Sequence, residues 1–183
     1  MTTPRILIAG VGNIFLGDDA FGVEVVRRLA SRPLPEGVRI ADFGIRGFDL
    51  AFALLGAYDL AVLVDATPRG GQPGTLYVIE PEPEPSGTEN VPVETHGMNP
   101  ENVLRLVRSL GGSPPPLRVV GCEPTTFGSE EEPALGLSPP VGAAVDEAVR
   151  LIEGLVAEYV DGGRAASGVS GPEALYRSET KGG

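Results

Sequence analysis

Apolar residues follow two patterns along this chain, one typical of buried strands and one typical of amphipathic helices. Near-continuous apolar runs predict strands over residues 5–9, 38–42, 60–64, 75–79 and 117–122. Apolar residues at helical spacing predict helices over residues 22–30, 47–55, 99–110 and 138–159. The helix over 47–55 is expected to be largely buried, because most of its residues are apolar.

This order of elements predicts an α/β fold, with a mostly parallel, twisted sheet of about five strands flanked by helices on both faces, of the phosphorylase/hydrolase-like type. Residues 1–161 are predicted to form a single domain. From residue 162 onward the chain is rich in Gly, Ser and Ala without periodicity, so this tail is expected to be disordered. Two acidic, proline-containing segments, 80–86 and 123–137, are expected to be surface loops.

Composition narrows the range of partners. The chain has 183 residues and a net charge of −11, which argues against nucleic acid and against an anionic membrane surface. No apolar run is long enough to span a bilayer, and no secretory signal is visible. Cys122 is the single cysteine, so no disulfide forms within the chain and a cytoplasmic location is expected. Cys122 ends an apolar strand and is predicted to be a buried, unreactive thiol.

The corner after the first strand contains glycines and two adjacent acids. Gly10 and Gly12 resemble a dinucleotide-binding turn, but the third glycine position of that fingerprint is Phe15. A phosphate-binding loop is equally excluded, because Asp18 and Asp19 stand where a lysine is needed. Two carboxylates attract a cation and are favoured at a helix start. Either acid also fits a helix N-cap, and Asp18 fits this role better than Asp19; because one helix needs only one N-cap, a cap at Asp18 would leave Asp19 for chemistry.

Three side chains suited to metal or proton chemistry follow predicted strands. Asp19 follows the first strand, Asp65 ends the central strand, and His96 lies after the fourth. If these strands run parallel, their carboxyl ends meet at one edge of the sheet and the three side chains converge there. Two carboxylates and an imidazole suit a divalent metal with coordination positions left open. Taken singly, Asp65 also fits a turn residue and His96 a solvated loop residue.

The number of histidines argues against two other kinds of catalytic site. His96 is the only histidine, which excludes a His-Glu-x-x-His zinc site. A serine-hydrolase triad would need it as the base, but the chain has no Gly-x-Ser-x-Gly turn to supply the nucleophile.

With these residues in place, the chain resembles the endopeptidases that mature nickel–iron hydrogenases. The resemblance covers residues 4–160 and rests on four segments: Gly10-x-Gly-Asn through Asp18-Asp19, the stretch 42–47, Val64-Asp65-Ala66 with His96 downstream, and residues 121–138 ending in Gly-Leu-Ser. The departures are mild. Ala20 stands where glycine is common, and Phe43, Ile45 and Arg46 replace smaller residues in the second segment.

The resemblance implies an activity. Members of this family remove a C-terminal extension from the hydrogenase large-subunit precursor after nickel insertion. By this resemblance Asp19, Asp65 and His96 bind nickel, which the substrate supplies, although another divalent metal is expected to bind in vitro. Three roles stay open for them: gripping the nickel of the substrate, holding a metal that polarises the scissile carbonyl or activates water, and direct activation of water by two aspartates. The departures at 43–46 affect the choice of hydrogenase.

Two other functions fit parts of the sequence. A non-catalytic chaperone that docks on the nickel site is consistent with the absence of an unmistakable nucleophile. Peptidyl-tRNA hydrolases also begin with a Gly-x-Gly-Asn strand end. That family requires a histidine soon after, where this chain has residues 17–20, and an RNA substrate fits poorly with a charge of −11.

Overall fold

A five-stranded sheet forms the centre of the computed structural model, which describes residues 3–81 and 100–163. The strands lie in the order β2-β1-β3-β5-β4. Their bounds are β1 Ile6–Val11, β2 Val38–Gly44, β3 Leu60–Ala66, β4 Leu76–Ile79 and β5 Leu117–Cys122. The helices are α1 Phe21–Leu29, α2 Gly47–Leu54, α3 Pro100–Ser109 and α4 Pro139–Gly163, and a short 3₁₀ turn, η1 Asp18–Ala20, precedes α1.

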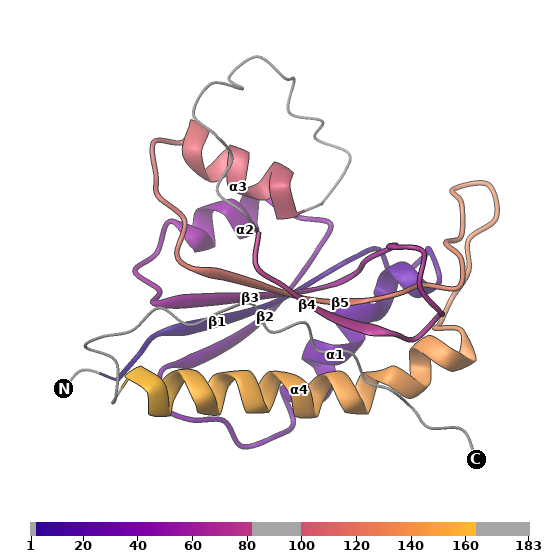
Figure 1. Cartoon of the computed structure of the whole chain (residues 1–183). Coiled ribbons are helices and arrows are strands. Elements are labelled where there is room, and N and C mark those ends of the chain that lie inside the picture. The colour runs from indigo at the N-terminus through magenta and orange to yellow at the C-terminus, as the bar shows by residue number, and fades with distance from the viewer. Residues whose placement is uncertain (1–2, 82–99, 164–183) are drawn as a thin grey trace.

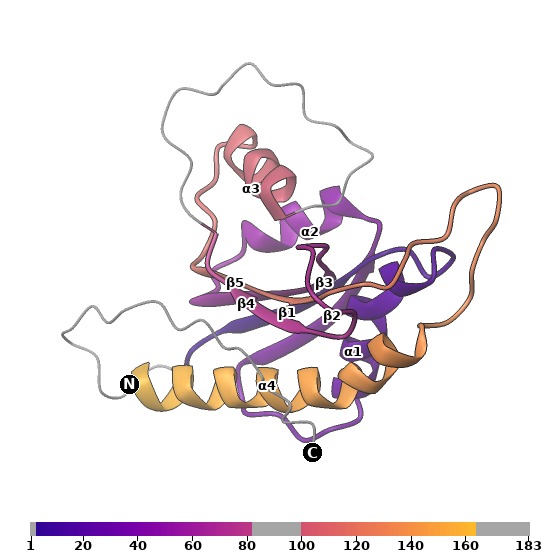
Figure 2. The same ribbon diagram turned by 45° about the vertical axis from the view of Figure 1, so that its right-hand side comes forward.

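Helices cover both faces of the sheet, as the sequence predicts. Helices α2 and α3 lie on one face, and α1 and α4 on the other (Figures 1 and 2). Each face has its own apolar core, and alternate residues of β1 and β3 contribute to the two cores in turn. Every residue of β1 and β3 is buried, which explains why these strands are almost wholly apolar in sequence.

The fourth strand departs from the parallel arrangement. β1, β2, β3 and β5 run parallel, whereas β4 pairs with β5 in the antiparallel direction. Its last residue, Ile79, therefore pairs with Val119 inside β5, and the chain leaves β4 toward the edge opposite the carboxyl ends of the parallel strands. The expectation that parallel strand direction delivers His96 to the carboxyl edge is thus wrong in its premise. His96 itself lies outside the described residues.

Two predicted helices differ from expectation in detail. Helix α2 is only half buried, since Leu50, Ala51 and Leu54 face the core while Phe48 and Phe52 are more than half exposed. Only one face of α2 packs on the core, so a mostly apolar sequence overstates its burial. Helix α4 continues to Gly163, beyond the predicted helix end at 159 and the predicted domain boundary at 161. The tail from 164 lies outside the described residues.

Glycines allow α1 to sit directly on the carboxyl ends of two strands. A Cβ on Gly22 would lie 2.0 Å from the Val64 carbonyl oxygen of β3 and 2.4 Å from the Val11 carbonyl oxygen of β1. A Cβ on Gly10 would lie 2.5 Å from the carbonyl oxygen of Gly22. These distances leave no room for any side chain. The start of α1 is therefore fixed against β1 and β3 by backbone contact, and the acids just before it are fixed as well.

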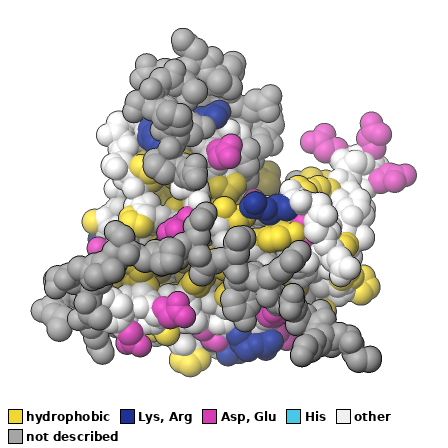
Figure 3. Space-filling view, viewed as in Figure 1, with side chains coloured by type: hydrophobic (Ala, Val, Ile, Leu, Met, Phe, Trp, Pro, Cys, Tyr) yellow, Lys and Arg dark blue, Asp and Glu magenta, His cyan; other side chains and the backbone are white. Residues whose placement is uncertain are grey.

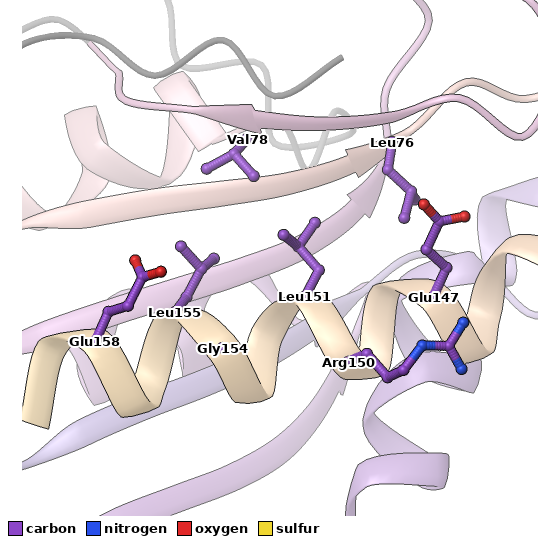
Figure 4. A pocket seen from close by; sticks show the side chains of 8 residues that line it. All are labelled: Leu76, Val78, Glu147, Arg150, Leu151, Gly154, Leu155 and Glu158. Atoms are coloured by element: carbon purple, nitrogen blue, oxygen red, sulfur yellow. The ribbon is translucent and has the colours of Figure 1, made fainter. Parts of the chain in front are cut away.

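A groove lies between β4 and α4 (Figure 4). Its volume is about 550 Å³, and it is lined by the apolar side chains of Leu76, Val78, Leu151 and Leu155 and by the charged residues Glu147, Arg150 and Glu158 of α4. It opens on the face of the sheet that α1 and α4 cover. Among the helices in the described part of the chain, none is long and apolar enough to cross a bilayer.

Replacement of Gly22 by alanine tests the close backbone contact of α1 with β1 and β3. Because the new Cβ would overlap two carbonyl oxygens, we expect Gly22→Ala to lower the free energy of unfolding by at least about 2 kcal/mol in urea denaturation. Gly154→Ala is the matched control. Gly154 is exposed on α4 with no atom within 4 Å of a new Cβ, so this change should stabilise by roughly 0.5–1 kcal/mol. Equal changes in the free energy of unfolding for the two variants would contradict the close contact at Gly22.

Candidate active site

Asp19 lies in the turn that connects β1 to α1. One carboxylate oxygen of Asp19, Oδ2, accepts a hydrogen bond of 2.8 Å from the backbone N–H of Asn13. Gly12 has a φ of 132°, and a Cβ there would lie 1.7 Å from the carbonyl oxygen of Asp19, so the turn folds tightly on itself. The side chain is half buried. Burial raises the pKa of Asp19, and the Asn13 hydrogen bond offsets part of this increase.

Asp65 lies near the end of β3, beside Asp19. It is one of three buried polar or charged residues among those described, with 8% of its surface exposed. Burial raises the pKa of Asp65 well above its usual value, the nearby charge of Asp19 raises it further, and the backbone N–H of Ala66 opposes both effects. The structure therefore brings Asp19 and Asp65 together as two carboxyl groups in unequal surroundings.

The third predicted site residue, His96, lies outside the described residues. Within residues 3–81 and 100–163, no group of three His, Cys, Asp or Glu side chains forms a metal cage. Neither Asp19 nor Asp65 forms an ion pair with a described Arg or Lys. The acid pair thus lacks a compensating cation within the described part of the chain.

Asp18 does not cap a helix, contrary to the prediction from sequence. Its side chain is 1% exposed and points away from the helix start, toward the segment that follows β5. It accepts hydrogen bonds from the backbone N–H of Thr125 at 2.8 Å and from the N–H and hydroxyl of Ser138 at 2.7 and 2.8 Å. The adjacent acids therefore face different partners, and Asp18 fastens the loop 123–138 to the β1–α1 turn.

That loop projects from the body of the molecule. Figure 1 shows it at the right between β5 and α4, and Figure 3 shows acidic side chains gathered at its tip. Its base pairs with the β1–α1 turn, because Ala134 bonds to the carbonyl of Phe15 and to the N–H of Gly17. The sequence predicts this loop but not its attachment, since no local pattern links residues more than 100 positions apart.

Glu123 is a further buried acid, and the sequence analysis did not single it out. Its carboxylate accepts hydrogen bonds from the backbone N–H groups of Arg69 and Gly70, at 2.8 and 3.1 Å, and from the Tyr77 hydroxyl at 2.8 Å. Burial alone would raise the pKa of Glu123, yet these donors outweigh it and hold the pKa below its ordinary value. Glu123 therefore fixes the loop between β3 and β4, which begins just after Asp65.

The segment 42–47 lies on the other side of the acid pair. An irregularity between Gly10 and Val11 shifts the register of β1 against β2 by one residue. Phe43 is buried there, while Ile45 is 65% exposed. The Arg46 side chain folds back to donate hydrogen bonds to the carbonyls of Phe43 and Asp42. The two substitutions at 45 and 46 thus present an apolar side chain and a cation on the surface next to the β1–α1 turn.

The arrangement suits proton transfer or cation binding. Asp65, the more buried acid, holds a proton more tightly, whereas Asp19 accepts a backbone hydrogen bond that favours its charged form. Cys122 takes no part, since it is fully buried and burial first raises its pKa, to about 12. The groove between β4 and α4 contains neither aspartate among its lining residues.

Comparison with known proteins gives one consistent family. A family model described as hydrogenase maturation protease matches residues 23–155. The hydrogenase 2 maturation protease of Escherichia coli is 33% identical over 149 residues, covering 81% of this chain and 88% of that protein. A putative hydrogenase maturation protease of Methanocaldococcus jannaschii is 32% identical over 160 residues, covering 84% and 97%.

Solved structures agree with the sequence relatives. The hydrogenase maturating endopeptidase HybD from Escherichia coli aligns with a TM-score of 0.66 and 32% identity, covering 84% of this chain and 93% of that one. The NiFe hydrogenase maturation protease HycI from Thermococcus kodakarensis aligns with a TM-score of 0.60 and 28% identity, covering 84% and 92%. The predicted fold is thereby confirmed.

Replacing Asp18 tests its role as a fastening between distant segments. Because three hydrogen bonds to a buried carboxylate are lost, we expect Asp18→Ala to lower the free energy of unfolding by about 2–4 kcal/mol, more than the roughly 1 kcal/mol of a helix cap. Asp161→Ala, at an exposed position near the end of α4, is the control and should change stability by less than about 0.5 kcal/mol. A cap-sized effect at Asp18 would contradict the interpretation.

The Glu123 network predicts a dependence of stability on pH. A carboxyl whose folded pKa is lowered stabilises the fold above its unfolded pKa, and this contribution disappears as the pH falls through the folded pKa. We expect Glu123→Gln to cost about 1–2 kcal/mol at neutral pH, with the difference from wild type shrinking below about pH 4. Urea denaturation across this range measures both values. Glu131→Gln, exposed in the same loop, should show neither effect.

Proposed function

The chain belongs to the hydrogenase maturation protease family, and we propose that it removes a C-terminal extension from the large-subunit precursor of a nickel–iron hydrogenase after nickel has been inserted. The observation that carries the proposal is the pair formed by Asp19 and Asp65 at the carboxyl ends of β1 and β3. This edge is where open α/β sheets bind their ligands.

The acid pair fits a divalent cation. Asp19 is half buried and Asp65 is buried, and neither has a described Arg or Lys partner. The two carboxyl groups therefore repel one another, and this repulsion is part of what raises the pKa of Asp65. A metal ion would remove the repulsion and favour the charged form of both groups. We propose that the ion is the nickel of the substrate, with Asp19 and Asp65 as ligands and His96 as a third.

Binding of the substrate's own metal would make nickel insertion a condition for cleavage. The contacts to nickel supply binding energy only when the precursor contains the metal, and that energy then positions the extension beside the acid pair. Without a metal on the pair, Asp65, with its raised pKa, is suited to hold a proton, and Asp19, fixed by the N–H of Asn13, is suited to accept one from water; with a metal bound, both groups would instead serve as charged ligands. An aspartic-type route and a metal-assisted route both begin from this arrangement.

Substitution of the two aspartates tests the proposal. We expect Asp19→Asn and Asp65→Asn each to lower the rate of processing by at least about 100-fold, because each removes a ligand or a proton carrier. Both variants should fold, since neither residue belongs to the apolar core. The measurement is the loss of mass from a purified nickel-loaded large-subunit precursor. Asp161→Asn, exposed on α4, is the control for a change of the same kind.

The metal requirement is tested with the same assay. Metal-free enzyme is mixed with precursor that contains nickel, zinc or no metal, and only the nickel form should be processed rapidly. Rapid processing of metal-free precursor would contradict nickel recognition and leave a conventional peptidase. Activity that appears only when metal is first bound to the enzyme would favour a metalloprotease. Binding of the nickel-loaded precursor without any loss of mass would favour a docking chaperone.

A further inference from the structure

The carboxyl edge of the sheet carries a second feature on the same face as Asp65. Asp65 of β3 pairs with Gly121 of β5, and Gly121 pairs with Tyr77 of β4. Directly paired residues of neighbouring strands point to the same face, so Asp65, Gly121 and Tyr77 form one row across three strands. Gly121 has no side chain, and the space beside it is taken by Thr67, whose Oγ1 lies 2.5 Å from where a Cβ would be.

Arg69 lies at the far end of this row. Its guanidinium carbon is 5.5 Å from the centre of the Tyr77 ring, within the range of a cation–π contact. Its backbone N–H is bound by Glu123, which also accepts the Tyr77 hydroxyl, so the same carboxylate holds both partners. Thr67 donates its N–H to the Cys122 carbonyl at 2.8 Å and fixes the start of the loop. The position of Arg69 is thus well determined by its surroundings.

The Arg69 side chain is exposed and forms no ion pair with any carboxylate in the described part of the chain. Glu123, the acid beside it, already accepts three hydrogen bonds. In this respect Arg69 differs from the five described arginines that pair with an acid, which are Arg27, Arg28, Arg32, Arg46 and Arg118. An exposed guanidinium on an aromatic ring is a suitable receptor for a carboxylate.

The spacing of the row sets which part of a substrate would reach Arg69. Neighbouring strands lie about 4.8 Å apart, so Asp65 and Tyr77 are separated by roughly 10 Å. An extended peptide advances about 3.3 Å per residue, so this distance corresponds to about three residues, and the further 5.5 Å from the Tyr77 ring to the Arg69 guanidinium extends the range to about five. In the proposed reaction the retained side of the scissile bond belongs to a folded subunit. The extension is the part free to lie in extended form along the strand ends.

We propose that Arg69, held over Tyr77, binds a carboxylate of the excised extension about three to five residues beyond the scissile bond. This inference rests on the proposed function. Arg69 is a specificity residue: it touches the extension, and the acid pair cleaves without its help. The carboxylate comes either from an Asp or Glu side chain or from the chain terminus, because both present the same two oxygens to a guanidinium.

An aspartate scan of the substrate tests the proposal. Nickel-loaded precursors are prepared with an otherwise uncharged extension that carries a single Asp at each of the first eight positions in turn. We expect wild-type enzyme to show a maximum of kcat/KM at positions three to five, about tenfold above the other positions and mainly through KM. A further precursor whose chain ends at position four tests the terminal carboxylate, and its C-terminal amide should lose the advantage.

Variants of Arg69 complete the test. Arg69→Gln should flatten the profile, and Arg69→Glu should invert it, so that Lys at positions three to five is now preferred. Arg150→Glu is the matched control, since Arg150 is exposed on α4 at the opposite face of the sheet, and its profile should equal that of wild type. A flat wild-type profile, or an Arg69→Glu profile that equals wild type, would overturn the proposal. Failure of wild-type enzyme to cleave any precursor would instead overturn the proposed function.

Discussion

The arrangement of this molecule depends on the contact between the backbone of Gly22 and the carbonyl oxygens of Val11 and Val64. Helix α1 has no side-chain layer between its first turn and the ends of β1 and β3, so its position along both strands is set by hard contact. The turn before the helix must then fit into a fixed space, and it places the Asp19 carboxylate beside Asp65. The site is therefore a consequence of how closely the backbone packs.

Asp18, Asp65 and Glu123 are buried acids near the β1–α1 turn, and their different hydrogen-bond partners give them different roles. Asp18 and Glu123 are fully supplied with hydrogen-bond donors and serve to hold loops in place. Asp65 is buried with few donors, and burial first, then the charge of Asp19, raises its pKa. A carboxylate with satisfied hydrogen bonds contributes to stability, whereas a poorly satisfied one is available for a ligand or a proton.

The sequence was sufficient to predict the elements of the fold, because strands such as β1 and β3 and the stripe on α4 have strong periodicity. It also predicted that Asp19 and Asp65 lie near each other, because Asp19 follows one parallel strand and Asp65 lies at the end of another. It did not predict the direction of β4, because a short edge strand has the same residue pattern in either direction. The partners of Asp18 and Glu123 were missed for a related reason: they come from distant segments, and a local cap explained Asp18 equally well.

The bond between Asp18 and Ser138 joins residues that are 120 positions apart. Closing so large a segment costs considerable chain entropy, which is recovered only after β3, β5 and the start of α4 have assembled. The turn that carries Asp19 therefore acquires its final support late in folding. A chain in which this bond has not formed therefore lacks one support of the turn that carries Asp19.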